Sequence, residues 1–329
     1  MTKTNLRHFA LGVLLAVGCG YAAASVSKAE QYTSYVIAGK NDAQHHLHQQ
    51  AAIMWQATAP QLTSLAKSEQ AQWWLAQADL LQFEHRFDAA LLALDKVLAL
   101  STLQQSAYLM QARIALTRHN LPLATQACQA LTAYAQFDVV ATCLLEIKGR
   151  AGELTTSYVA LQRLQARNAE TSSALRQWRN QILAEQAQLL KRYDEALIWL
   201  DYVNYATNPV VMQRQILDVL LLTERAEDII RLSGTCPIVD ALPVDSMLVR
   251  IAHAEAKLGM QYCWRKVAAE RMHLRELRAD ALHTSDLAYY FIYLQPSAVK
   301  ALHWARQNVA VAQEPFDQQL LAAAKEISP

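Results

Sequence analysis

A local pattern that recurs about every 35 residues constrains the fold of this chain more than any other feature. An aromatic residue just after a turn, with alanine three positions later, occurs at Phe87 with Ala90 and again at Tyr193 with Ala196. The two aromatic residues are 106 positions apart (193 minus 87), close to three such intervals. Apolar residues around both places recur every three or four positions, as on one face of a helix. The pattern predicts pairs of helices that stack in series, because one pair cannot bury its apolar faces alone.

Extending the interval along the chain predicts where the second helix of each pair begins. The predicted starts are residues 87, 121, 154, 193, 226, 261 and 298, in steps of 33 to 39 residues. Residues 69–233 would hold five pairs, and residues 244–329 two more pairs and a C-terminal capping helix. Between them, residues 234–243 contain Pro237 and Pro243 and would form an irregular linker. Residues 30–68 would form a polar segment with one helix.

The composition agrees with an all-α fold. Only 8 of the 329 residues are glycine, about 2.4% against roughly 7% in average proteins. All-β folds and doubly wound α/β folds use more glycine in turns and phosphate loops, so both classes are disfavoured. The net charge of +1 provides no overall field that would attract nucleic acid or an acidic membrane surface.

The repeated residues resemble a known family, the tetratricopeptide repeat proteins, over residues 69–313. The first repeat resembles the family consensus at Trp74, Ala78, Phe87, Ala90, Leu94 and Val97, and the fourth at Leu183, Ala184, Tyr193, Ala196 and Leu200. The C-terminal stretch is similar to the closing segment of a family of uncharacterised exported proteobacterial repeat proteins, at Leu282-His283, Asp286-Leu287-Ala288, Ala301-Leu302, Ala305, Asn308, Gln313-Glu314-Pro315 and Asp317. The resemblance implies an α-solenoid of about seven helical hairpins with a capping helix, and it implies no activity.

Residues 1–29 have the three parts of an export signal. Lys3 and Arg7 precede an apolar stretch at residues 9–17, and the small residues 22–24 allow cleavage after Ala24. Ser27-Lys28-Ala29 offers a second cleavage site. We therefore expect a periplasmic or exported protein. Two alternatives remain, in which residues 9–24 stay as an uncleaved anchor in the inner membrane or Cys19 is lipidated.

The standard motifs of catalysis and nucleotide binding are absent from the sequence, including G-x-S-x-G, H-E-x-x-H, the Walker A motif and C-x-x-C. We therefore expect no enzymatic activity and no cofactor. The segment His45-His46-Leu47-His48 carries three imidazoles, which suit zinc, copper or nickel. A solvated polar segment is the preferred interpretation, since so short a histidine tract specifies little. A metal carrier or an enzyme that uses this segment remains the alternative.

A stacked helical array presents a concave surface lined by the first helix of each pair. Polar residues expected on that surface are Asp79, Gln82, Arg113, Glu146, Arg150, Glu185 and Gln188. Such a groove binds an extended peptide or a partner helix. We therefore predict a non-catalytic scaffold for protein–protein interaction, with an unidentified protein as partner. A membrane-tethered accessory of assembly or secretion is a further alternative if the N-terminus stays uncleaved.

Aromatic and basic runs elsewhere favour structural roles. Trp73-Trp74 and Tyr289-Tyr290-Phe291 are expected to pack in the core, with ligand platforms as the alternative. Arg271, Arg275 and Arg278 lie among acidic residues and predict a solvated, charged helix face.

Four cysteines follow the predicted signal, and an oxidising compartment permits two disulfides. Cys128 and Cys143 lie seven or eight residues on either side of a turn near Gln136, at similar heights on two antiparallel helices. We expect this pair to be the closer one and a candidate disulfide. Cys236 and Cys263 are separated by a predicted helix at residues 245–258, so only a loop that folds back along it would join them.

Overall fold

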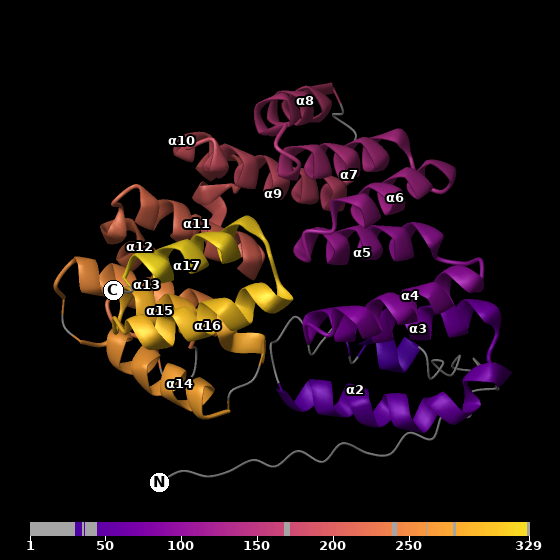
Figure 1. Cartoon of the computed structure of the whole chain (residues 1–329), viewed down its shortest axis with the longest axis horizontal. Helices are drawn as coiled ribbons and strands as arrows, with labels where there is room; N and C mark the ends of the chain where they lie inside the picture. The colour runs from indigo at the N-terminus through magenta and orange to yellow at the C-terminus, as the bar shows by residue number, and fades with distance from the viewer. Residues whose placement is uncertain are drawn as a thin grey trace, which may run out of the picture.

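The computed structural model describes residues 30–34, 36, 45–167, 172–238, 242–260, 262–278 and 281–327. Within these residues every regular element is an α-helix or a short 3-10 helix, so the predicted all-α class is confirmed. The predicted signal lies outside the described residues. Among the helices of the described part, none combines the length and apolarity needed to cross a membrane. The helices form an arch, and its two arms approach each other again at the C-terminal helix (Figure 1).

Neighbouring helices pack in pairs, and each pair packs on the next along the chain. The pairs are α3 (Lys67–Phe83) with α4 (Phe87–Ala99), α5 (Gln104–Thr117) with α6 (Leu121–Ala130), α7 (Phe137–Arg150) with α8 (Leu154–Arg167), α9 (Ser173–Leu189) with α10 (Tyr193–Trp199), α11 (Val210–Leu222) with α12 (Ala226–Ser233), α13 (Asp245–Lys257) with α14 (Trp264–Arg278), and α15 (Thr284–Tyr293) with α16 (Ala298–Val311). Before them lies α2 (His45–Thr58), and after them α17 (Pro315–Glu326). Short 3-10 helices occur at Ala59–Ser64, Leu131–Ala133, Tyr202–Thr207 and Ala281–His283.

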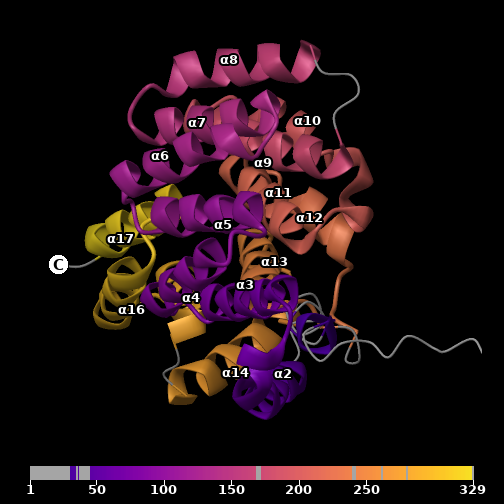
Figure 2. The same ribbon diagram turned by 90° about the vertical axis from the view of Figure 1, so that its right-hand side faces the viewer.

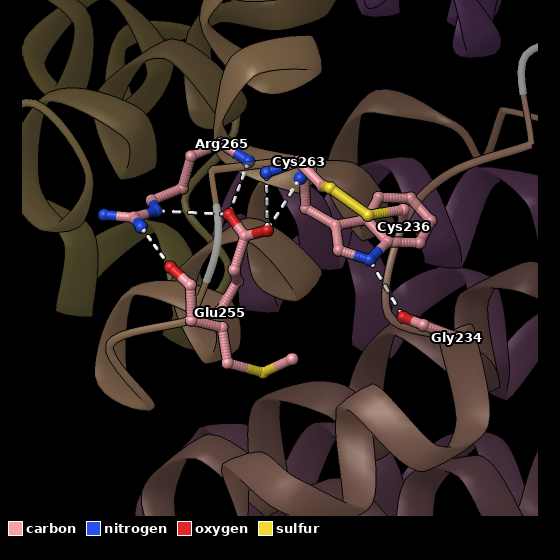
Figure 3. Close-up of polar contacts among 7 residues, drawn as sticks. Gly234, Cys236, Glu255, Cys263 and Arg265 are labelled. Carbon is pink, nitrogen blue, oxygen red and sulfur yellow. Dashed lines mark hydrogen bonds and ion pairs between the residues drawn. A yellow bond between two sulfur atoms is a disulfide. The ribbon is translucent and has the colours of Figure 1, made fainter.

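Most second helices begin where the periodicity predicted, at residues 87, 121, 154, 193, 226 and 298. The exception is α14, which begins at Trp264 rather than at residue 261. The reason is a buried carboxylate, because Glu255 accepts the backbone N–H groups of Cys263, Trp264 and Arg265 at 2.8 to 2.9 Å. A carboxylate at this position satisfies the unpaired N–H groups of a helix start, so α14 begins there (Figure 3).

The turns inside the pairs share one backbone form. A residue with positive φ lies two positions before the second helix in five of the pairs, at His85, His119, Gly152, Lys191 and Glu224. The next residue donates its N–H to a carbonyl five positions earlier, as Arg86 does to Leu81 and Arg225 to Leu220, both at 2.8 Å. This is the hydrogen bond of a Schellman turn. Four of these five turns have a residue other than glycine at the position with positive φ, so the turns form although the chain contains few glycines. Each such residue costs conformational energy that glycine would avoid.

Small residues allow close contact between the paired helices. Ala90 and Ala196 are fully buried, as the repeat pattern predicted. Gly149 on α7 allows a close contact with α9 of the next pair, because an added Cβ there would lie 2.4 Å from Nε2 of Gln186.

The N-terminal segment covers the first pair. Tyr32 is fully buried and donates its hydroxyl to Oε1 of Gln77 at 2.6 Å. Trp73 is 1% exposed and stacks on Trp55 of α2 with ring centroids 5.7 Å apart. The expected core role of Trp73 is therefore confirmed, and the run from Tyr289 to Phe291 is likewise buried.

The structure forms two disulfides. Cys128 and Cys143 are bonded with their Cα atoms 5.7 Å apart, which is the pair that the turn geometry favoured. Cys236 and Cys263 are also bonded, with Cα atoms 5.2 Å apart, so the expectation that they are the more distant pair was wrong. The loop after α12 does fold back along α13, and the indole N–H of Trp264 donates to the carbonyl of Gly234 at 2.9 Å (Figure 3).

The C-terminal end of the array returns to its beginning. Residues 311–314, named here the C-terminal clasp, connect α16 to α17 and contact the end of α5. The N–H of Gln313 donates to the carbonyl of Thr117 at 2.7 Å, and the Thr117 hydroxyl donates to Oε1 of Glu314 at 3.4 Å. Val311 packs against the apolar cluster of α3, α4 and α5. Both ribbon views place α17 beside α5, so the clasp closes the arch (Figures 1 and 2).

Candidate functional site

Charged side chains from four successive pairs meet on the inner side of the arch. The inner-face cluster consists of Arg113 on α5, Glu146 and Arg150 on α7, Glu185 on α9, Arg214 on α11 and Glu314 of the clasp. Each helix that contributes is the first of its pair, and α8, α10 and α12 lie farther out (Figure 1). The stacking of first helices therefore brings together residues that are far apart in the sequence.

The centre of the cluster is a two-pronged ion pair. Nε and Nη2 of Arg150 lie 2.8 and 2.9 Å from the two carboxylate oxygens of Glu185. Burial opposes the charge of Arg150, but the carboxylates of Glu185, Glu314 and Glu146 outweigh it and raise the pKa of Arg150. Burial raises the pKa of Glu185, and the positive charge of Arg150 offsets part of this increase. The pairing holds both side chains in a fixed orientation on the inner face.

Glu146 is a second buried carboxyl in the cluster whose pKa is raised. Burial, followed by the charge of Glu185, raises the pKa of Glu146 to about 7, while Arg150 and Arg113 act in the opposite direction. In the part of the chain that the structure describes, its carboxyl makes no hydrogen bond or ion pair. Glu146 therefore changes charge near neutral pH, and the cluster gains a negative charge as the pH rises.

Arginine and aromatic side chains pack together where the start of α17 meets α11 and α13. The Phe316 ring at the start of α17 lies 5.7 Å from the guanidinium carbon of Arg214 and 5.0 Å from that of Arg250. Arg250 is 1% exposed, and its Nε donates to Oδ1 of Asp218 at 2.5 Å. The ring of Tyr289 packs on the same guanidinium at 4.8 Å. These contacts hold the first turn of α17 against the inner face.

The structure brings together four of the seven residues expected on the concave surface: Arg113, Glu146, Arg150 and Glu185. Gln188 lies beside them and accepts from Nε2 of Gln215 at 3.4 Å. Asp79 and Gln82 on α3 lie elsewhere. The carboxylate of Asp79 acts on buried Tyr32 of the N-terminal segment, and Oε1 of Gln82 is buried without a hydrogen-bond partner in the described residues. The sequence analysis did not identify Glu314 or Arg214. Glu314 reaches the site only because the C-terminus returns to α5, whereas Arg214 lies on the first helix α11 and could have been found from the same periodicity.

A second polar cluster is built around a buried aspartate. The carboxylate of Asp245 binds Arg271 at 2.7 Å and Arg275 at 2.6 Å, and Nδ1 of His283 lies 3.2 Å away. The prediction of a solvated arginine face was therefore wrong for Arg271 and Arg275, because α14 packs these side chains over the start of α13. Arg278 at the end of the helix is exposed.

Donor atoms of Asp245, His283 and Asp286 lie within 4.8 Å of one another, as the ligands of a metal ion would. Both oxygens of Asp245 already accept from guanidinium groups, however. A metal ion bound to either oxygen would compete with an arginine that already pairs with it. The arrangement therefore fits a structural ion-pair network better than a metal site.

His45, His46 and His48, the ligands in the alternative metal-binding interpretation, fall in the first turns of α2. Their side chains lie outside the described residues, so the solvated segment stays the prediction and metal binding the alternative.

An apolar surface groove of about 520 Å³ lies between α2, α3 and α4. Trp55, Trp74 and Leu92 line it, together with the basic residues Arg86 and Lys96. Nε1 of Trp55 is buried and has no hydrogen-bond partner among the residues that the structure describes. The groove is a second concave surface, separate from the inner-face cluster.

Comparison with protein-family models and with curated proteins finds no match for the chain.

Proposed function

We propose that the chain is a tetratricopeptide-like α-solenoid of about seven helical hairpins that acts as a non-catalytic scaffold for protein–protein interaction. The observation that carries the proposal is the inner-face cluster, to which four consecutive pairs contribute charged side chains. Alternating guanidinium and carboxylate groups on a concave surface suit the polar groups of an extended peptide or a partner helix.

The proposed place of action is the bacterial envelope, after export by the signal in residues 1–29. The two disulfides support this, because such bonds persist in oxidising compartments and are rare in reducing ones. N-terminal sequencing of the mature protein separates the exported form from an anchored form, which would retain residues 9–24.

Charge reversal on the inner face tests the function. Arg113→Glu and Arg150→Glu, each in the full chain, should weaken capture of crosslinked partners from an envelope extract, since they change the charge of the cluster. Arg163→Glu provides the matched control, because Arg163 is an exposed arginine on the second helix α8. Circular dichroism checks that each variant is folded. If capture survives both inner-face reversals and is lost in Arg163→Glu, the partner binds the outer face and the proposal is wrong.

A further inference from the structure

The clasp is bound to the inner face much as an extended peptide would be. Ala312 has φ −121° and ψ 132°, and Glu314 has φ −69° and ψ 162°, so the chain is extended between α16 and α17. Its backbone N–H at Gln313 and its carboxylate at Glu314 both bind Thr117. Its aliphatic residue Val311 packs on the cluster of α3, α4 and α5.

The groups on the inner face that contact the clasp can also bind other extended segments that carry a carboxylate. Thr117 is the last residue of α5, and the last carbonyls of a helix have no partner within it. That carbonyl accepts an N–H from any extended chain, without regard to its sequence. The charge of Arg150 favours a carboxylate at the position of Glu314, whereas the carboxylates of Glu185 and Glu146 oppose it. The hydrogen bond from the Thr117 hydroxyl fixes where that carboxylate lies.

The clasp has few contacts with α5, whereas α17 is firmly attached to its own arm. Leu320 and Ala324 of α17 are buried against α15 and α16. The turn before α17 is held by Asn308, which donates to Oδ1 of Asp317 at 2.7 Å, and by the N–H of Glu314, which donates to Oδ2 of Asp317 at 2.9 Å. The clasp can therefore leave Thr117 while α17 keeps its fold.

We propose that the clasp occupies in cis the binding place of a partner segment, and that the partner displaces it. The partner segment is extended and acidic, with a carboxylate in the place of Glu314, a backbone N–H paired with the Thr117 carbonyl, and an aliphatic residue three positions earlier. This inference depends on the proposed function, since it names the kind of peptide that the inner face binds. Partner binding and opening of the arch are then the same event.

The clasp and a partner segment compete for the same place, and this competition determines how tightly the protein binds an added peptide. The hydroxyl and carbonyl of Thr117 cannot bind the clasp and a partner segment at once. The apparent affinity for a partner is therefore lowered to the extent that the clasp is closed. A variant with a weaker clasp should bind an added acidic peptide more tightly.

The test uses the full chain and an acetylated, amidated peptide with the sequence of residues 309–316. Binding is measured by fluorescence anisotropy for the unaltered protein, for Glu314→Gln and for Glu270→Gln. The last variant is the matched control, because Glu270 is exposed on α14. We expect Glu314→Gln to bind about tenfold more tightly than the other two, the effect of losing one charge-assisted contact from the clasp. Replacing glutamate by glutamine in the peptide, or Arg150 by glutamine in the Glu314→Gln variant, should abolish the gain.

Opening of the arch is measured separately by double electron–electron resonance. This method gives the distance between spin labels attached at Gln126→Cys on α6 and Gln319→Cys on α17. The peptide should lengthen this distance. Equal binding to all three proteins, or tighter binding without a change in distance, would overturn the clasp proposal. If the clasp proposal fails while partner capture still depends on Arg113 and Arg150, the proposed function stands. If that dependence also fails, the function itself is wrong.

Discussion

Replacing Glu146 by glutamine should change how the stability of the protein depends on pH. Burial and the neighbouring Glu185 raise the pKa of Glu146 from 4.5 to about 7, so the folded protein binds this proton more tightly than the unfolded chain does. The stabilising contribution is therefore complete below pH 4.5 and is lost as the pH rises through 7. Glutamine has nearly the same size and stays neutral, so it removes this dependence.

The size of the effect follows from the two pKa values. The interval from 4.5 to about 7 corresponds to ~3.4 kcal/mol at 1.36 kcal/mol per pH unit. Because Glu146 is only half-buried and water screens part of the interaction, we expect about 2 kcal/mol. Unfolding in urea at pH 5 and pH 8.5 measures the difference. The variant should match the unaltered protein at pH 5 and exceed its stability by about 2 kcal/mol at pH 8.5.

Glu270→Gln again provides the control, since Glu270 is exposed and should leave the pH dependence unchanged. Burial also raises the pKa of Asp286 and of Asp317 from 3.8 to about 6, so the unaltered protein and both variants should lose stability as the pH rises from 3.8 through 6. An identical difference between pH 5 and pH 8.5 in Glu146→Gln and the unaltered protein would refute the reasoning for this carboxyl.

Three further predictions concern the packing that positions the inner face. Gly149→Ala should lower the free energy of unfolding by about 1–3 kcal/mol in denaturant titration, because the new methyl group would overlap the buried amide of Gln186; an unchanged midpoint would contradict the close contact. Lys191→Gly should raise stability by about 1 kcal/mol, since Lys191 has a φ of 59° in its turn, and a loss of stability would show that the turn differs. Glu255→Ala should cost about 3–5 kcal/mol, because it removes the acceptor of three backbone N–H groups and the charge opposite Arg265; thermal unfolding within a degree of the unaltered protein would rule out that role.

The helical pairs were predictable because their signals are local. An aromatic residue, a tight turn and a small residue such as Ala90 or Ala196 lie within one short stretch, and the resulting helix starts match the structure at six positions. The turns themselves were not predictable from glycine, because His85, Lys191 and Glu224 adopt positive φ in its place. The recurring hydrogen bond to the carbonyl five positions earlier fixes that form.

The features that the sequence did not reveal depend on long-range contacts. Periodicity placed Glu146, Arg150 and Glu185 on first helices, and the stacking of those helices did bring them together. It gave no indication that Glu314 would join them, because the curvature that returns the C-terminus to Thr117 accumulates over the whole array. The Cys236–Cys263 bond was missed for a similar reason, since it depends on the path of an irregular loop.

The central claim, that the inner face is the partner-binding surface, is tested most directly by site-specific photocrosslinking in intact cells. A photoreactive residue is placed at Gln188 on the inner face or at Arg163 on α8. We predict that a protein partner is crosslinked from position 188 and that position 163 gives no product. Crosslinking from position 163 alone would contradict the account.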